Sequence, residues 1–426
     1  MDNPIVQRLK KLTFLWLEFT DEKEARICRW LVKADEVSMI KTFYQLQTSE
    51  GNDTADFFIQ LSAPLNSVVD YSSGIKNEFL DIIKSIQEES DEEDIKSWGV
   101  SKKFMEDSTL ESALKIFERF AECLKLPEGF LVIYLTPASL KKQADLIEWL
   151  QIALEIGISE RVRFMMMDAL EDPLLDELCE NYPQLAHTIE PNLNMSAAVK
   201  KLASAGDASD PGVKFRKAYV LLTQAIAKQD MSLVKKTSEK AFKIADKNKW
   251  PHMKVAVKMA TAGAFLGKSD YDKAYDLYGE AFTYSEDAFK EGDIASGKLA
   301  VTTLFSQASA MIGAKKFDIA LESYERAIPF AIKTEDFYNQ MEAWRMAGYC
   351  QSRLKKYDAA WEAYAKALDS GEKLDEQLRK SSTLPFVGYE LKLLANRTDH
   401  ADQVDRIEER MIHLVGENWT EKLEVV

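Results

Sequence analysis

Cysteine, glycine and proline are scarce in this chain of 426 residues. It has 4 Cys, 17 Gly and 11 Pro. The cysteines, Cys28, Cys123, Cys179 and Cys350, lie far apart, so the sequence contains no CxxC pair, no zinc-ligand spacing and no disulfide framework. Few glycines and prolines beside many Ala, Glu, Lys and Leu residues favour a helix-rich fold. Unpaired cysteines fit a reducing compartment, and we expect a cytoplasmic protein.

Long hydrophobic runs and an excess of positive charge are also lacking. No stretch reaches the roughly 18 apolar residues that a membrane span needs. The apolar start is interrupted by Glu18, and no small-residue cleavage site of a signal peptide follows it. The chain has 70 acidic and 55 basic residues, which gives a net charge of −15. Such a surface repels phosphate backbones, so we expect neither membrane insertion nor a nucleic-acid partner.

The sequence motifs of common enzyme classes are absent as well. There is no GxxxxGK[ST] phosphate loop, no GxGxxG, no GxSxG and no HExxH. The four histidines are scattered, without the paired spacing of metal ligands. We therefore predict no catalytic residue, no metal ligand and no cofactor, and we expect the protein not to be an enzyme.

Two stretches divide the chain. Residues 87–99 (QEESDEEDIKSWG) are crowded with acidic side chains and predict a solvated loop or a frayed helix end. Residues 203–212 (ASAGDASDPG) have the composition of a linker. We predict a helical segment over 1–50, an α/β domain over 51–202, a linker over 203–212 and a helical-repeat domain over 213–426.

The N-terminal half has the pattern of a parallel α/β fold. Residues 1–50 have helical spacing, and Thr20 or Asp21 is the expected cap of a helix that carries Ile27, Trp30 and Leu31. Short apolar runs at 56–61, 130–135, 162–168 and 186–191 predict strands, and 139–157 predicts a helix capped by Ser139. This half loosely resembles a degenerate P-loop-like domain that has lost its phosphate loop.

Ligands of open α/β sheets bind beyond the carboxyl ends of the strands. Here those ends are the segments 61–64, 135–139 and 167–173. Asp168 is the sole acidic residue directly at a strand end, which makes it the one weak candidate for an enzymatic site. The alternative, which we favour, is an aspartate that caps a helix or shapes a turn.

Three nearly identical segments of twelve residues occupy 271–282, 317–328 and 357–368. Each has the pattern aromatic-x2-Ala-x3-aromatic-x2-Ala, which places large and small side chains alternately on one face of a helix. A weaker copy begins at Met231, so successive copies lie 40, 46 and 40 residues apart. Upstream of the last copy, Trp344, Ala347 and Gly348 form a W-x2-A-G pattern on a partner helix.

These motifs resemble the tetratricopeptide repeat (TPR), a helix–turn–helix unit that usually has a period of 34 residues. The longer spacing implies longer helices. The resemblance covers roughly residues 213–415 and implies a solenoid of about four to five helix pairs, of which 376–415 forms the cap, because each pair buries the apolar face of its neighbour. The alternative is that these are ordinary core helices of another bundle.

In TPR solenoids the first helix of each pair lines a concave groove for a peptide or a helix of a partner. When the groove positions of the TPR motif are transferred in register to this sequence, mostly apolar and small residues line the groove. Such a lining favours an amphipathic helix as the ligand. Alternatively, packing between the repeats or the N-terminal half covers them. The residues implied are Tyr219, Val220 and Thr223; Met259, Ala260 and Gly263; Phe305, Ser306 and Ser309; and Arg345, Met346 and Tyr349.

The resemblance implies a non-enzymatic adaptor, chaperone or scaffold that binds a protein or peptide partner. Bacterial secretion and toxin-delivery systems use such proteins, and that setting is an analogy of fold alone. Two alternatives stay open: a divergent nucleotide-binding or hydrolytic α/β domain with a TPR sensor, and a regulator whose groove receives a signalling peptide. The sequence does not determine the oligomeric state.

Overall fold

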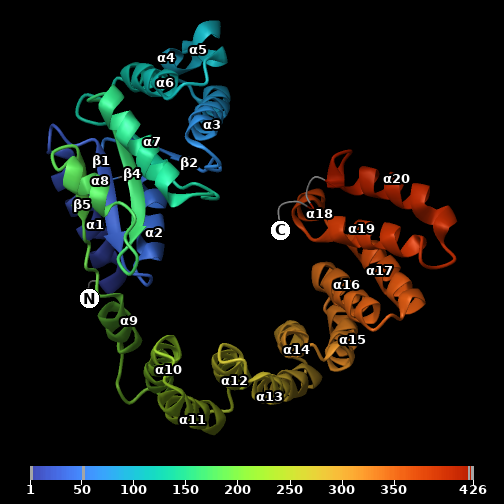
Figure 1. Ribbon diagram of the computed structural model, residues 1–426. Coiled ribbons are helices and arrows are strands. Elements are labelled where there is room, and N and C mark those ends of the chain that lie inside the picture. The colour runs from blue at the N-terminus through green and yellow to red at the C-terminus, as the bar shows by residue number, and fades with distance from the viewer. Residues whose placement is uncertain (1–2, 50–52, 421–422, 424–426) are drawn as a thin grey trace. The chain divides into compact units, whose positions relative to one another are not determined.

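The computed structural model describes residues 3–49, 53–420 and 423. The chain forms two compact units, Met1–Leu202 and Ala203–Val426, which we call the N-terminal unit and the C-terminal unit. The first is a small parallel α/β domain and the second is a TPR-like array of helices, so the predicted fold class is confirmed (Figure 1).

The N-terminal unit contains one five-stranded sheet with the order β2-β3-β4-β1-β5, and all four strand pairs are parallel. Its elements are α1 (Pro4–Thr20), β1 (Ile27–Val32), α2 (Val37–Gln47), β2 (Phe57–Leu61), α3 (Val68–Glu89), α4 (Glu93–Ser97), α5 (Lys102–Glu106), α6 (Leu110–Cys123), β3 (Leu131–Leu135), α7 (Gln143–Ile156), β4 (Val162–Ala169), α8 (Asp176–Asn181), β5 (Ala186–Ile189) and α9 (Met195–Ala203).

Both faces of this sheet are buried, because side chains alternate along each strand. On β3, Leu131, Ile133 and Leu135 join a core with α3, α6 and α7. Val132 and Tyr134 join a second core with α1 and α2 on the other face. The continuous apolar runs in the sequence therefore correspond to strands covered by helices on both sides, and the predictions for β2, β3, β4 and β5 are confirmed.

The predicted helix over Ile27, Trp30 and Leu31 is wrong. These residues form β1, which lies inside the sheet between β4 and β5 and is buried along its whole length. Arg29 interrupts the apolar run and hides the strand pattern in the sequence. Residues 27–32 thus belong to the sheet and not to a separate helical segment.

The predicted cap at Ser139 is also wrong. The carbonyl oxygen of Ser139 accepts a hydrogen bond from the Leu65 amide, and α7 begins only at Gln143. The end of this helix at Gly157 is as predicted, because that glycine has φ of 104°. In the acidic stretch 87–99, α3 ends at Glu89 and the short helix α4 follows.

The C-terminal unit is a row of antiparallel helix pairs, each packed against the next. In Figure 1 the first helices of the pairs lie on the inner side of this row. Its elements are α10 (Pro211–Ala227), α11 (Met231–Lys247), α12 (Pro251–Leu266), α13 (Tyr271–Lys290), α14 (Ile294–Gly313), α15 (Phe317–Lys333), α16 (Phe337–Arg353), α17 (Tyr357–Gly371), α18 (Glu376–Ser381), α19 (Leu384–Ala395), η1 (Ala401–Gln403) and α20 (Val404–Val415).

The repeated sequence pattern forms the contact between paired helices. Both alanines of each of the three segments are fully buried, and their central tyrosines, Tyr278, Tyr324 and Tyr364, are at most 5% exposed. The turns repeat too. Each residue two positions before a second helix adopts a left-handed conformation, with φ between 54° and 61°. These residues are Gln229, Ser269, Lys315 and Lys355, whose spacings match those of the repeat.

Candidate functional site

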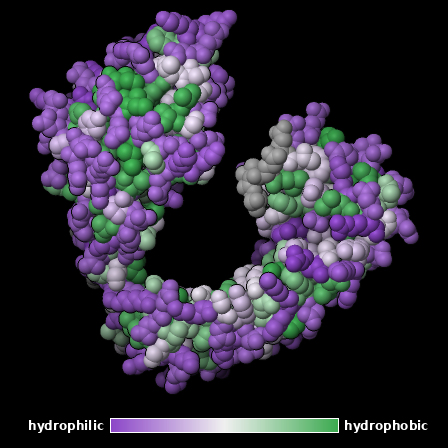
Figure 2. Space-filling view, in the orientation of Figure 1, coloured by the Kyte–Doolittle hydropathy of each residue, from purple (hydrophilic) through white to green (hydrophobic). Residues whose placement is uncertain are grey.

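The predicted groove residues occupy equivalent places on the first helices α10, α12, α14 and α16. In every pair the first two positions, beginning at Tyr219, Met259, Phe305 and Arg345, are half-buried. The third position is exposed in three pairs, where it is a small residue: Thr223, Gly263 or Ser309. This regular change in exposure fits one helix face that is turned partly to solvent. Figure 2 shows pale, near-neutral patches between purple, hydrophilic ones along the inner side of these helices.

The large members of this set also support the helices behind them. Tyr219 stacks on Phe215 with ring centroids 5.7 Å apart. Phe305 meets Tyr324 edge to face at 5.4 Å, and Met259, Phe305, Met346 and Tyr349 all pack against the same buried cluster. Replacing Phe305 or Met346 by a polar residue would therefore perturb the fold as well as any ligand contact, so the exposed small residues are better places to test binding.

Arg345 is the one charged residue of the set, and its charge is neutralised within α16. Its Nη2 lies 2.8 Å from a carboxylate oxygen of Glu342, three residues earlier on the helix. Glu342 is only 9% exposed and also accepts a hydrogen bond from the Thr383 hydroxyl. Because this ion pair is internal, Arg345 does not offer a free cation to a ligand. The sequence analysis did not single out Glu342. The signal that could have found it is the spacing of three residues between Glu342 and Arg345, which places the two side chains next to each other on a helix.

Asp168 has a structural role at the end of β4. Its carboxylate accepts hydrogen bonds from the amides of Leu174 and Leu175, at 2.9–3.1 Å. It also pairs with Arg29, whose Nη2 lies 2.7 Å away, and both side chains are almost fully buried. These contacts use the oxygen atoms that a catalytic carboxylate would need free. The interpretation as a turn aspartate is therefore the one that the contacts support.

The loop after β1 is where a phosphate loop would lie in a parallel α/β domain of this kind, because that motif joins a strand to a helix. Here the loop contains Glu36, which is 2% exposed and precedes α2. Its carboxylate accepts hydrogen bonds from the amides of Lys33, at 3.2 Å, and Leu193, at 2.5 Å. A buried carboxylate therefore stands where the anionic phosphates would have to bind.

One group of Ser, His and Asp side chains needs comparison with a hydrolase triad. His252 Nε2 lies 2.5 Å from Asp293 Oδ2 and 3.3 Å from Ser296 Oγ. A triad requires the serine and the aspartate on different ring nitrogens, whereas both contact the same nitrogen here. Hydrogen bonds from Ser296 and His252 lower the pKa of Asp293, which precedes α14 and accepts from the Ala295 amide. The group stabilises the start of a helix.

Neither a metal centre nor a membrane span is visible in the described part of the chain. No three His, Cys, Asp or Glu side chains among those residues are arranged to hold a metal ion. None of the described helices combines the length and the apolar character that a membrane crossing requires.

No protein-family model matches the chain, and comparison with curated proteins found no match. Several solved structures resemble it at low identity. The apo form of RapI is 12% identical over 84% of this chain and 80% of that one, with a TM-score of 0.43. BtubC from P. vanneervenii is 16% identical over 52% and 88%, with a TM-score of 0.41. Aspartyl phosphate phosphatase F from Bacillus subtilis is 11% identical over 93% and 77%, with a TM-score of 0.38. These values are too low to carry an argument about function.

Proposed function

We propose that the protein is a non-enzymatic adaptor or scaffold that holds a protein partner against the first helices of its C-terminal unit. The observation that carries this proposal is that the first two predicted groove positions are half-buried on each of four successive first helices. A regular face of this kind is a suitable surface for one extended or helical ligand, whereas a catalytic site would need converging polar groups.

The chemistry of this face favours an apolar ligand surface. The half-buried positions include Tyr219, Met259 and Phe305, and the charge of Arg345 is already paired. Methionine and aromatic side chains provide adaptable apolar contacts, and exposed Thr223 and Gly263 leave room for a ligand to approach the helices. An amphipathic helix that presents large apolar side chains would fill that room.

The experiment places a large side chain on the groove without touching the core. A chain with Thr223→Trp and Gly263→Trp tests it, because both positions are exposed and a Cβ on Gly263 would meet nothing closer than the Tyr278 hydroxyl at 3.9 Å. The matched control is Lys236→Trp with Asp276→Trp, which adds the same two side chains to exposed positions on the second helices α11 and α13.

Affinity capture from native lysate with quantitative mass spectrometry compares the three chains. We expect the groove variant to lose at least 90% of the main partner while the control retains it, and both to keep the melting temperature of the parent. Equal capture by the groove variant and the parent would refute the groove. A partner shorter than about 15 residues would favour the peptide-responsive regulator over the adaptor.

A further inference from the structure

The strand β2 forms one edge of the sheet in the N-terminal unit. It pairs with β3, and among the described residues no strand lies along its other edge. The Phe57 amide donates to the carbonyl of the residue before β3, and the Leu61 carbonyl accepts from the amide of the residue after β3. Because the backbone groups of a strand alternate in direction, the amides and carbonyls of Phe58 and Gln60 point to the open edge.

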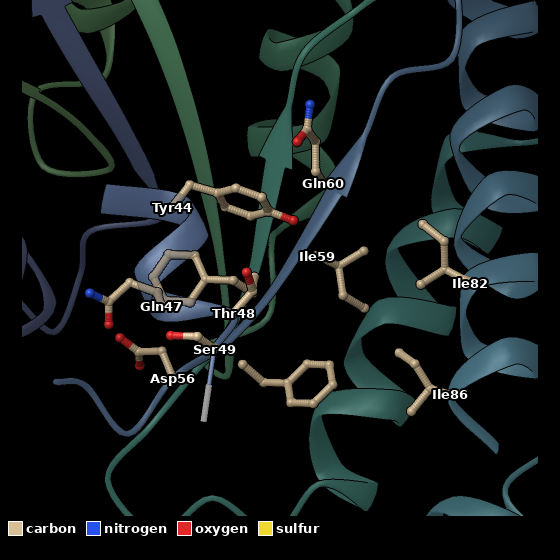
Figure 3. Close-up of a pocket in the computed structure, with 11 residues that line it drawn as sticks. Tyr44, Gln47, Thr48, Ser49, Asp56, Ile59, Gln60, Ile82 and Ile86 are labelled. Carbon is tan, nitrogen blue, oxygen red and sulfur yellow. The ribbon is translucent and has the colours of Figure 1, made fainter. Parts of the chain in front are cut away.

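A hollow of about 490 Å³ runs along this open edge (Figure 3). Five consecutive residues, 56–60, line it. Neighbouring side chains of a strand point to opposite faces of the sheet, so five residues in a row can border one hollow only along the edge of the strand. Ile82 and Ile86 of α3 border the hollow on one face of the sheet. Tyr44 and Gln47 of α2 border it on the other.

Side chains satisfy part of this edge and leave its middle open. Beyond the end of β2, the Glu78 carboxylate accepts a hydrogen bond of 2.8 Å from the Ser62 amide. Within β2, the Tyr44 hydroxyl accepts a hydrogen bond from the Gln60 amide. The amide and the carbonyl of Phe58 have no partner on this side in the part of the chain that the structure describes. A free donor and a free acceptor thus stand at the centre of the hollow.

The sequence of β2 lacks the devices that usually keep strand edges from pairing. Such edges commonly contain charged residues or proline, are interrupted by a bulge, or are covered by another element. The five residues of β2 read FFIQL, without a charge or a proline, and all of them pair with β3 in unbroken register. A regular apolar edge of this kind is a template for another strand.

We propose that the open edge of β2 binds an extended segment of a partner protein, which pairs with it as a sixth strand of the sheet. The backbone of the segment bonds to the free amide and carbonyl of Phe58. Its side chains on one face meet Ile82 and Ile86 and are apolar, whereas those on the other face meet Tyr44 and Thr48 and are polar. The site lies within the N-terminal unit and does not depend on the groove proposed for the C-terminal unit.

The test measures the fluorescence anisotropy of a labelled peptide, KTVTVTVTK, that is titrated with the full chain. Valine and threonine alternate in this peptide, as the two faces of the site require. The control peptide is KTTVVVTTK, which has the same composition without the alternation. A series of peptides with one N-methyl group at each successive amide tests for a strand, because only every second amide of a paired strand bonds to its neighbour.

Two pairs of variants locate the bound peptide. Gln60→Pro removes an amide from the open edge and keeps the bonds toward β3, and proline is tolerated at such edge positions. Its matched control is Gln60→Val, which also loses the side-chain amide but keeps the backbone amide. Thr48→Trp fills the hollow from an exposed position after α2. The matched control Ser38→Trp adds the same side chain at an exposed position in the first turn of α2, about 15 Å away along the helix.

We expect saturable binding of KTVTVTVTK, at least tenfold weaker binding of the control peptide, and losses from N-methylation that recur at every second position. Gln60→Pro and Thr48→Trp should each bind the peptide roughly tenfold more weakly than their matched controls, which is the effect of about one lost hydrogen bond. Should Gln60→Pro fail to fold, the pair of tryptophan variants decides.

Absence of saturable binding, N-methyl losses without a period of two, or equal affinity in Thr48→Trp and Ser38→Trp would overturn the proposal. Sedimentation tests the remaining occupant of the edge, a second copy of this chain. A parent chain that sediments as a dimer, together with a monomeric Gln60→Pro variant, would assign the edge to that second copy and overturn the proposal as well.

Discussion

Replacing Asp168 by alanine should strongly lower the free energy of unfolding of the N-terminal unit. The substitution leaves Arg29 buried at 2% exposure without its partner on β4, and it removes the acceptor of the Leu174 and Leu175 amides. Removal of one member of a buried ion pair typically costs about 3–5 kcal/mol. Arg29 keeps a contact of 2.6 Å with Asp176, which places the expected loss toward the lower end of that range.

The measurement is hydrogen exchange by mass spectrometry across a urea series, read on peptides that cover β1 and β4, because two units can unfold separately. Asp176→Ala is the control: that side chain is 55% exposed, and loss of its ion pair should cost less than about 1 kcal/mol. In a double-mutant cycle, Arg29→Met should recover part of the Asp168→Ala loss, since it removes the unpaired cation. A loss below about 1 kcal/mol in Asp168→Ala would show that the carboxylate does not hold the turn, and its assignment as a structural residue would fail.

Two further predictions concern the C-terminal unit and the segment before it. Ala320 and Ala360 are fully buried between helices, so Leu at either position should lower the free energy of unfolding by roughly 1–3 kcal/mol. The control Ala295→Leu, at an exposed position of α14, should change it by less than about 0.5 kcal/mol. Equal melting curves for all three variants would reject the assigned helix contacts. Residues 204–210 are all exposed and lie between α9 and α10, so limited proteolysis should cut there first and release a helical C-terminal fragment. First cuts within residues 250–370 would contradict the solenoid.

The helical repeats were predictable because their core residues recur in the sequence at regular spacing. Ala274, Ala320 and Ala360 recur beside aromatic residues, and all three are fully buried. The strand β1 was missed because Arg29 interrupts its apolar run. Arg29 can be buried there because it forms an ion pair with Asp168, which lies far along the chain. A single-sequence pattern contains no information on such a contact.

The helix register of the proposed groove residues was predictable, but their side-chain contacts were not. The motif correctly places Phe305 on a first helix, yet its edge-to-face contact with Tyr324 and the pairing of Arg345 with Glu342 depend on neighbouring helices and turns. The burial of the unpaired Tyr134 hydroxyl follows from how α2 packs over β3, which no local pattern encodes.

The loop after β1 bears on how far the N-terminal unit could act on nucleotides. A helix that begins at the end of a central parallel strand offers backbone amides and a partial positive charge to an anion. In this chain the carboxylate of Glu36 takes amide hydrogen bonds there, one from Lys33 and one from Leu193. Phosphates at this place would meet the buried Glu36 side chain, whose hydrogen bonds join the end of β1 to the segment after β5.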